Sequence, residues 1–385
     1  MSMLSDELLD RIRERAPGYD RDNAFFTEDL ADLTEAGYLR AMVPESHGGA
    51  GLSLTQMVDE QIRLAGASPA TALAVNMHQI WVGVAKVAAA RGVDTLDFLL
   101  TEAAKDELFA FGISERGNDL VLFGSATEAR PDGEHGYTFH GTKIFTSLAP
   151  VWTWLGTFGL DSTSPDAPKS VFAFVRRDAG VHTKDDWDTM GMRATQSRTT
   201  VLDGAHAPAE RVARRLDPGP NPDPFIFGIF ACFEILISSV YAGIAQRALD
   251  VAIQTVQRRT SMKNDGAPYS HDPDIRWRIA DAGIALEGAL LQLRTIARDV
   301  DEQADHGSLW FAKLSSLKVR VTETAKDVVD AAVRVSGGGS YFNSSELSRL
   351  YRDVLAGLFH PSDDESAHNT MATALLGPLP EPPAS

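Results

Sequence analysis

A single carboxylate interrupts a long apolar stretch in the second half of the chain. Glu234 is the only charged residue between Phe225 and Gln246. Burial in apolar surroundings disfavours the charged form of a carboxyl, so the pKa of Glu234 should rise toward that of a useful general base. Ser238 and Tyr241 follow at helical spacing and should share its helical face. The alternative is a structural ion pair between Glu234 and an arginine at a subunit contact.

A second cluster of reactive side chains lies near the C-terminal end. The segment RLYRD at 349–353 supplies basic and aromatic groups, and Pro361 is followed by three acids within four residues. His360 could donate a proton there, and Asp363 could accept one. The alternative for His360 is a hydrogen-bonded structural histidine, and that for Asp363 is a solvated loop or a helix N-cap. The cluster therefore adds two catalytic candidates.

Composition and charge limit the class of protein. The chain has 385 residues, of which 44% are hydrophobic and 23% charged, as is typical of a soluble globular protein with a large core. The net charge of -17 argues against a nucleic-acid partner, which needs a concentrated basic face. Cys232 is the only cysteine, so no intramolecular disulfide can form, and the histidines show no metal-binding spacing. The acidic, amphipathic start lacks the features of a signal peptide, which indicates a cytoplasmic protein.

Hydrophobic periodicity predicts a protein that is mainly α-helical with a central β domain. Residues 1–108 show helical spacing and should form an N-terminal helical domain. Residues 109–216 contain short β-rich pieces between turn residues, which predicts a middle, β-barrel-like domain. Four prolines within 217–224 mark a boundary. Long apolar stripes over 225–376 predict a C-terminal four-helix bundle, and residues 377–385 should be disordered.

The apolar run that holds Glu234 is long enough to span a membrane. The polar residues within it, and the composition of the rest of the chain, favour a buried bundle helix instead. No membrane insertion is therefore expected.

Five motifs, in order along the chain, resemble those of the acyl-CoA dehydrogenase superfamily. They are FGISERGND at 111–119, GTKIFTS at 141–147, MGMR at 190–193, GIAQRALD at 243–250 with Arg258, and GG at 337–338 with YRD at 351–353. The first differs from the usual superfamily pattern, because it is about two residues shorter and has Arg116 in place of a proline. The order of helices, β domain and helical bundle also resembles that of the superfamily, over nearly the whole chain.

The resemblance implies a flavin-dependent oxidoreductase, a homotetramer or homodimer that holds FAD across a subunit interface. It implies loss of the α-proton of an acyl thioester, on CoA or on an acyl-carrier protein, with transfer of the β-hydride to flavin N5. Electron-transfer flavoprotein would then accept the electrons, or oxygen would do so. Because the α-proton of a thioester is weakly acidic, such a site needs a base of raised pKa and groups that stabilise the enolate-like oxygen.

The resemblance also implies roles for individual residues. Phe145 would stack on the flavin, Ser147 would bond its N5 side, and Arg258 would meet the cofactor pyrophosphate. The whole cofactor-binding set would be Phe111, Ile113, Ser114, Phe145, Ser147, Arg258, Arg334, Gly337 and Gly338. The substrate-binding set would be Asn118, Ser238 and Tyr241.

The chain departs from the superfamily at the catalytic base. Counted from the YRD motif, the usual glutamate and glycine fall on Pro361 and Ser362, and proline has no group that accepts a proton. Some members of the superfamily carry the glutamate on the first bundle helix, at a position that falls on Phe233, beside Glu234. Glu234 is therefore the leading candidate for the base.

Two other functions stay open, because fold analogy alone does not fix the chemistry. A flavin-dependent monooxygenase of the same fold uses FMN or another reduced flavin from a flavin reductase, activates oxygen and lacks the catalytic glutamate. The absence of the usual glutamate and the presence of His360 fit that function. The other alternative is a non-catalytic subunit that assembles with an active paralogue.

Overall fold

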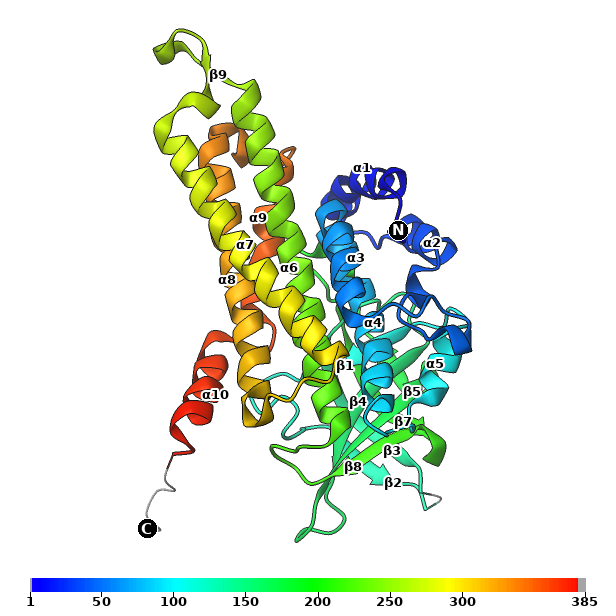
Figure 1. Cartoon of the computed structure of the whole chain (residues 1–385). Coiled ribbons are helices and arrows are strands. Elements are labelled where there is room, and N and C mark those ends of the chain that lie inside the picture. The colour runs from blue at the N-terminus through cyan, green and yellow to red at the C-terminus, as the bar shows by residue number, and fades with distance from the viewer. Residues whose placement is uncertain (1, 134, 380–385) are drawn as a thin grey trace. The chain divides into compact units, whose positions relative to one another are not determined.

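The chain is mainly helical and contains one large sheet. The computed structural model describes residues 2–133 and 135–379 (Figure 1). These residues group into two compact units. The first unit holds the residues up to 53 together with 70–189 and 193–232, and the second holds 54–69, 190–192 and the residues from 233 onward. The expected class, mainly α with a central β domain, is confirmed.

The two units do not follow the sequence ranges of the predicted domains. Most N-terminal helices share a unit with the sheet, whereas residues 54–69 belong with the C-terminal helices. The bounds 1–108, 109–216 and 225–376 stay predictions. Of the expected disordered tail, residues 380–385 lie outside the described residues.

The N-terminal helices of the first unit are held by capping and by aromatic packing. Their bounds are α1 (Asp6–Asp22), α2 (Thr27–Glu35), α4 (Pro69–Ala89) and α5 (Asp97–Ala103). Ser5 caps α1, since its hydroxyl accepts a hydrogen bond of 3.2 Å from the Leu8 backbone N–H. Trp81 ties the largely buried α4 to the sheet: its indole N–H donates to the Ala110 carbonyl (3.0 Å), and its ring packs 5.0 Å from that of Phe111.

The sheet of the first unit has eight strands in the order β6-β7-β3-β2-β4-β5-β8, with β1 paired to β4. The strand bounds are β1 (Phe109–Gly112), β2 (Glu128–Pro131), β3 (Tyr137–Thr146), β4 (Trp154–Asp161), β5 (Lys169–Arg176), β6 (Val181–Thr183), β7 (Arg198–Ala207) and β8 (Val212–Leu216). β4 pairs in parallel with β1 and β2, and the other pairs are antiparallel. Within the described residues β6 and β8 are unpaired edges, so the barrel-like form expected from the sequence is corrected to an open sheet.

The second unit is a bundle of long helices. Its helices are α3 (Leu54–Ala67), α6 (Pro224–Arg258, in this unit from Phe233 onward), α7 (Pro273–Asp301), α8 (Trp310–Ser336), α9 (Glu346–Val354) and α10 (Asp364–Leu376). α7 and α8 lie side by side over much of their length (Figure 1). The Asp301 carboxylate at the end of α7 accepts hydrogen bonds of 2.8 Å from the backbone N–H groups of Leu54 and Thr55. It thereby caps α3, and α3 also packs against α7, so this N-terminal segment belongs with the C-terminal bundle.

α6 is the one helix among the described residues that is long and apolar enough to cross a membrane. Of its most apolar window, however, 83% is buried inside the protein. The core helix of a soluble protein has the same length and composition, so this feature is weak evidence for a membrane span. The burial agrees with the expected bundle helix.

Candidate active site

Glu234 lies on α6 and is only 1% exposed. Its Oε1 atom accepts hydrogen bonds from the Ser362 backbone N–H (3.2 Å) and from the Ser362 hydroxyl (2.8 Å). The Ser362 hydroxyl also donates toward Oγ of Ser315 on α8, over the longer distance of 3.2 Å. The Oε2 atom is buried and accepts no hydrogen bond from any described residue. One carboxylate oxygen is therefore fixed, and the other remains open to a proton.

Burial raises the pKa of Glu234 to about 8, against the opposing effects of the Ser362 hydrogen bonds and the Lys318 charge. No arginine pairs with this carboxyl in the described part of the chain. The alternative from the sequence, an ion pair with an arginine at a subunit contact, involves a second subunit and stays a prediction. Oε1 faces Ser362, in the segment where the superfamily pattern places its usual glutamate.

Two further polar groups contact the loop that carries Ser362. Lys318 on α8 is 1% exposed, and its Nζ atom donates to the His360 carbonyl oxygen over 2.7 Å. The Tyr241 hydroxyl on α6 lies 2.8 Å from Nε2 of His360. Burial raises the pKa of Tyr241, while burial and the Lys318 charge lower the pKa of His360. We therefore assign a neutral imidazole that accepts the Tyr241 proton at Nε2, which leaves the hydrogen on Nδ1.

Asp363 and Ser238 already have local hydrogen-bond partners. Asp363 is exposed, and its carboxylate caps α10 by accepting a hydrogen bond of 2.9 Å from the Ser366 backbone N–H. This is the N-cap that the sequence left open as an alternative. The Ser238 hydroxyl donates to the Glu234 carbonyl oxygen one turn back (2.6 Å). The catalytic role of Asp363 and the substrate-binding roles of Ser238 and Tyr241 stay predictions.

On the first unit, a bulge in β3 turns Phe145 outward. The pairing of β3 with β7 shifts register between Lys143 and Thr146. Phe145 has φ of 57° and is 58% exposed, a strained conformation for an aromatic residue. Its ring is 6.2 Å from that of Trp187, at an angle of 89°. An exposed aromatic ring on a strained bulge is a typical feature of a ligand contact rather than of a core.

A chain of buried hydroxyl groups lies next to Phe145 in sequence. Ser147 Oγ is 2.7 Å from Ser197 Oγ, which is 2.7 Å from Thr195 Oγ1. An exposed aromatic ring followed by such hydroxyls fits a planar, hydrogen-bonding ring system such as a flavin. The roles predicted for Phe145 and Ser147 agree with this fit and stay predictions.

The other predicted contacts of this unit lie at the end of β1. Phe111 and Ile113 have buried side chains, so only their backbone is available to a ligand. Ser114 is half-buried, and its carbonyl oxygen accepts a hydrogen bond of 2.9 Å from the Ile144 backbone N–H. This bond joins the segment after β1 to the bulge that carries Phe145.

A buried ion pair fixes the following loop to β3. The Lys143 Nζ atom lies 2.7 Å from Oε1 of Glu115, and both side chains are almost completely buried. The other donors to this carboxylate are the side chains of Asn118, Ser125 and Thr127 and the backbone N–H groups of Ala126 and Thr127. Burial alone would raise the pKa of Glu115, but Lys143 and the hydroxyl donors lower it to about 2. The Asn118 amide donates to Glu115 within this loop, and the substrate contact predicted for Asn118 stays a prediction.

The residues predicted to hold the cofactor phosphates and ribose lie in the second unit. Arg258 is exposed at the end of α6 and donates to its own helix at the Gln254 carbonyl oxygen (3.3 Å). Arg334 is exposed and pairs with Asp330 over 2.6 Å. Gly337 has φ of 74°, and a Cβ atom there would lie 2.9 Å from a guanidinium nitrogen of Arg259. At Gly338 a Cβ atom would meet nothing within 4 Å, so an open backbone follows α8.

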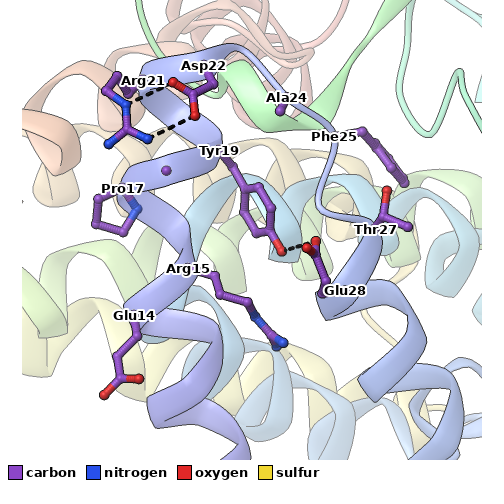
Figure 2. A pocket seen from close by; sticks show the side chains of 11 residues that line it. Glu14, Arg15, Pro17, Tyr19, Arg21, Asp22, Ala24, Phe25, Thr27 and Glu28 are labelled. Atoms are coloured by element: carbon purple, nitrogen blue, oxygen red, sulfur yellow. Dashed lines mark hydrogen bonds and ion pairs between the residues drawn. The ribbon is translucent and has the colours of Figure 1, made fainter.

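A surface hollow of about 750 Å³ lies between α1 and α2 of the first unit. Figure 2 shows the Tyr19 ring between the two helices, with its hydroxyl donating to Glu28 over 2.7 Å. Arg21 pairs with Asp22 over 2.8 Å. The hollow contains none of the predicted site residues, so it does not argue for catalysis.

Sequence reasoning misses Lys318, Ser315 and Ser362. A signal for Lys318 exists: it follows Leu314 by four residues and precedes Val321 by three, so it lies within the apolar stripe of α8. A charge in that position has to be buried. Ser362 carries no such signal, because its partner Glu234 is 128 residues away.

Two domain models of one protein family match parts of the chain. Residues 2–90 match "Acyl-CoA dehydrogenase, N-terminal domain", and residues 235–364 match "Acyl-CoA dehydrogenase, C-terminal domain". The putative acyl-CoA dehydrogenase YdbM of Bacillus subtilis is 28% identical, over 95% of this chain and 93% of the relative. L-evernosamine nitrososynthase of a Micromonospora species is 30% identical, over 91% of this chain and 84% of the relative.

Two solved structures have the same fold as this chain. KijD3, in complex with FMN and a dTDP-amino-keto sugar, is 27% identical with a TM-score of 0.84, over 96% of this chain and 91% of that one. Butyryl-CoA dehydrogenase from Megasphaera elsdenii has a TM-score of 0.83 over 97% of this chain and 99% of that one. At 20% identity, the latter likeness concerns the fold alone.

Proposed function

Because the chain belongs to the acyl-CoA dehydrogenase family, and its relatives are flavin-dependent oxidoreductases and monooxygenases, we propose that it oxidises an acyl thioester between the α and β carbons. One observation carries this proposal. The Glu234 carboxyl is buried, its pKa is raised by burial, and Oε2 accepts no hydrogen bond from a described residue. A base for a weakly acidic C–H group needs these properties.

In the proposed reaction, Glu234 takes the α-proton on Oε2 while the β-hydrogen leaves the substrate as hydride. The α and β C–H bonds break and a carbon–carbon double bond forms, so the substrate loses two electrons. Bound FAD supplies the two-electron acceptor. The Ser362 N–H and hydroxyl hold Oε1 and thereby orient the carboxylate.

The remaining predicted residues would bind and orient the cofactor. We assign Phe145, Ser147 and the backbone of residues 111–114 to the flavin ring. Arg258, Arg334, Gly337 and Gly338 would hold the phosphates and ribose. The subunits would form a homotetramer or homodimer in the cytoplasm, without membrane insertion. Electron-transfer flavoprotein or oxygen would reoxidise the cofactor.

An anaerobic titration of the FAD-loaded protein with a panel of acyl-CoA thioesters tests the proposal. Loss of the oxidised flavin absorbance with any thioester is the expected result. The Glu234→Gln variant should keep the flavin and lose this bleaching, whereas Glu287→Gln, an exposed position on α7, should behave as the wild type. Undiminished bleaching in Glu234→Gln would refute the assignment of the base. A protein that binds no flavin would favour the non-catalytic subunit.

A second candidate is a reductase-coupled flavin monooxygenase. The observation that favours it is the 30% identity to an amino sugar nitrososynthase over 91% of this chain. The KijD3 structure, which holds FMN and an amino sugar nucleotide, points the same way. In that reaction, the Nδ1–H of His360, held by Tyr241, would be the proton donor. Product formation that requires a flavin reductase and oxygen, with no anaerobic bleaching by thioesters, would establish this function and exclude the first.

A further inference from the structure

Glu234 and Lys318 approach one short loop segment from two helices. Glu234, on α6, is hydrogen-bonded to Ser362, and Lys318, on α8, is hydrogen-bonded to the carbonyl oxygen of His360. Ser315, one turn before Lys318, lies 3.2 Å from the same Ser362 hydroxyl. A buried ammonium and a buried carboxyl therefore flank residues 360–362, without an ion pair between them in the described structure.

We propose that Lys318 is a positioning residue for proton transfer, whose buried charge favours the ionised form of Glu234, the form that can accept a proton. This inference rests on the proposed function of Glu234 as a base. The charge coupling itself can be measured without catalysis.

The absence of a direct ion pair matters for this role. Lys318 donates its hydrogen bond to the His360 carbonyl oxygen, so it does not occupy Oε2 of Glu234. Its charge nevertheless opposes the effect of burial on the pKa of Glu234. Because a buried charge is poorly screened, the effect extends beyond contact distance. Lys318 thus stabilises the carboxylate and leaves its reactive oxygen free.

Among the described residues, Lys318 is the one cation whose charge lowers the pKa of Glu234, while the buried Arg349 on α9 lies 3.9 Å from the Asp353 carboxylate. The nearby titratable groups on the elements packed around the pair are Tyr241 on α6, Glu323 on α8, Asp353 on α9, His360 in the loop and Asp363 at the start of α10. Tyr241, Glu323, Asp353 and Asp363 are neutral or negatively charged and cannot supply a positive charge. His360 is neutral, because burial and Lys318 lower its pKa. Lys318 is therefore the cation that acts on Glu234 within the described chain.

Infrared difference spectroscopy of the holoprotein between pH 6 and pH 10 tests the coupling. The carbonyl stretch of a protonated carboxylic acid is followed, and the Glu234→Gln variant identifies the band that belongs to Glu234. In the Lys318→Met variant, we expect the midpoint of this band to move at least about tenfold in proton concentration toward alkaline pH. The Lys318→Arg variant keeps the charge and should stay closer to the wild type. Lys313→Met, which removes a lysine from the same helix away from the loop, should leave the midpoint unchanged.

A Glu234 midpoint that is the same in Lys318→Met and in the wild type overturns the inference. If the wild type shows no Glu234 band above pH 6, a band that appears in Lys318→Met supports it, and no band in either overturns it. Where Lys318→Met does not fold, Lys318→Gln is measured in its place. A shifted midpoint in a protein that no thioester bleaches would support the coupling and refute the proposed function, so the two failures are distinguishable.

Discussion

Lys143→Met is expected to destabilise the first unit strongly. The substitution keeps the length of the side chain and removes the ammonium that neutralises the buried Glu115 carboxylate. The fall in the Glu115 pKa from 4.5 to about 2 contributes about 3 kcal/mol at neutral pH, but burial lowers the pKa of Lys143 to about 8, which costs a similar amount, so the intact pair contributes little net stability. Removal of one partner of a buried pair costs about 3–5 kcal/mol, because the other charge stays buried without compensation. We therefore expect a loss of about 3–5 kcal/mol in the free energy of unfolding at pH 7.

Urea unfolding, followed by tryptophan fluorescence, measures this loss against a matched control. Lys105 pairs with Glu102 over 2.9 Å but is 61% exposed, so Lys105→Met should cost less than about 1 kcal/mol. The folded pKa of Glu115 lies below its unfolded value, so its contribution is complete above pH 4.5 and is lost as the pH falls through about 2. The gap between Lys143→Met and the wild type should therefore be smaller at pH 4 than at pH 7. Equal losses in the two lysine variants would refute the reasoning.

Three further predictions concern Glu234, Asp363 and the glycines. The folded pKa of Glu234 is raised from 4.5 to about 8, so the wild type loses stability as the pH rises between those values. The melting temperature of Glu234→Gln, relative to that of the wild type, should therefore be higher at pH 8 than at pH 5. Asp363→Ala should cost about 1 kcal/mol through the lost N-cap and speed hydrogen exchange in α10, and turnover at a temperature where the variant is folded should equal that of the wild type; a loss of turnover there would support the catalytic role. A Cβ atom at Gly156 would lie 2.3 Å from the Trp81 ring, so Gly156→Ala should cost about 1–3 kcal/mol in thermal unfolding. Gly288→Ala on α7, where a Cβ atom meets nothing within 4 Å, should be neutral or stabilising by up to about 1 kcal/mol.

The order of helices, sheet and bundle follows from periodicity, because it depends on contacts between neighbours in sequence. The burial of Glu234 was predictable for the same reason, since a lone charge in an apolar run has to be enclosed with the run. The assignment of α3 to the bundle was not, because it depends on a cap from Asp301, 247 residues from Leu54. Local sequence patterns also do not predict that the sheet is open, because closure depends on whether two edge strands far apart in sequence pair with each other.

The candidate site also has features that the sequence predicts and features that only the fold reveals. Phe145 stands out by its motif, but its exposure results from a bulge that depends on the register of β3 and β7. Asp363 carries an acid in a suggestive place, and only the start of α10 explains its cap. Ser362 has no recognisable pattern, yet it is the group that orients Glu234. Residue types were readable from the chain, whereas their pairing required the fold.

During synthesis, α6 leaves the ribosome before α8 and the loop that carries Ser362 have been made. Ser362 follows Glu234 by 128 residues, an interval on the order of 6–25 seconds at about 5–20 residues per second. Throughout that interval the Glu234 carboxyl lacks Ser362 as a partner, and in water it is ionised, because its ordinary pKa is 4.5. A charge within an apolar segment opposes aggregation with other chains. We therefore expect the charge of Glu234 to oppose association of this segment with other chains until Ser362 and Lys318 are in place.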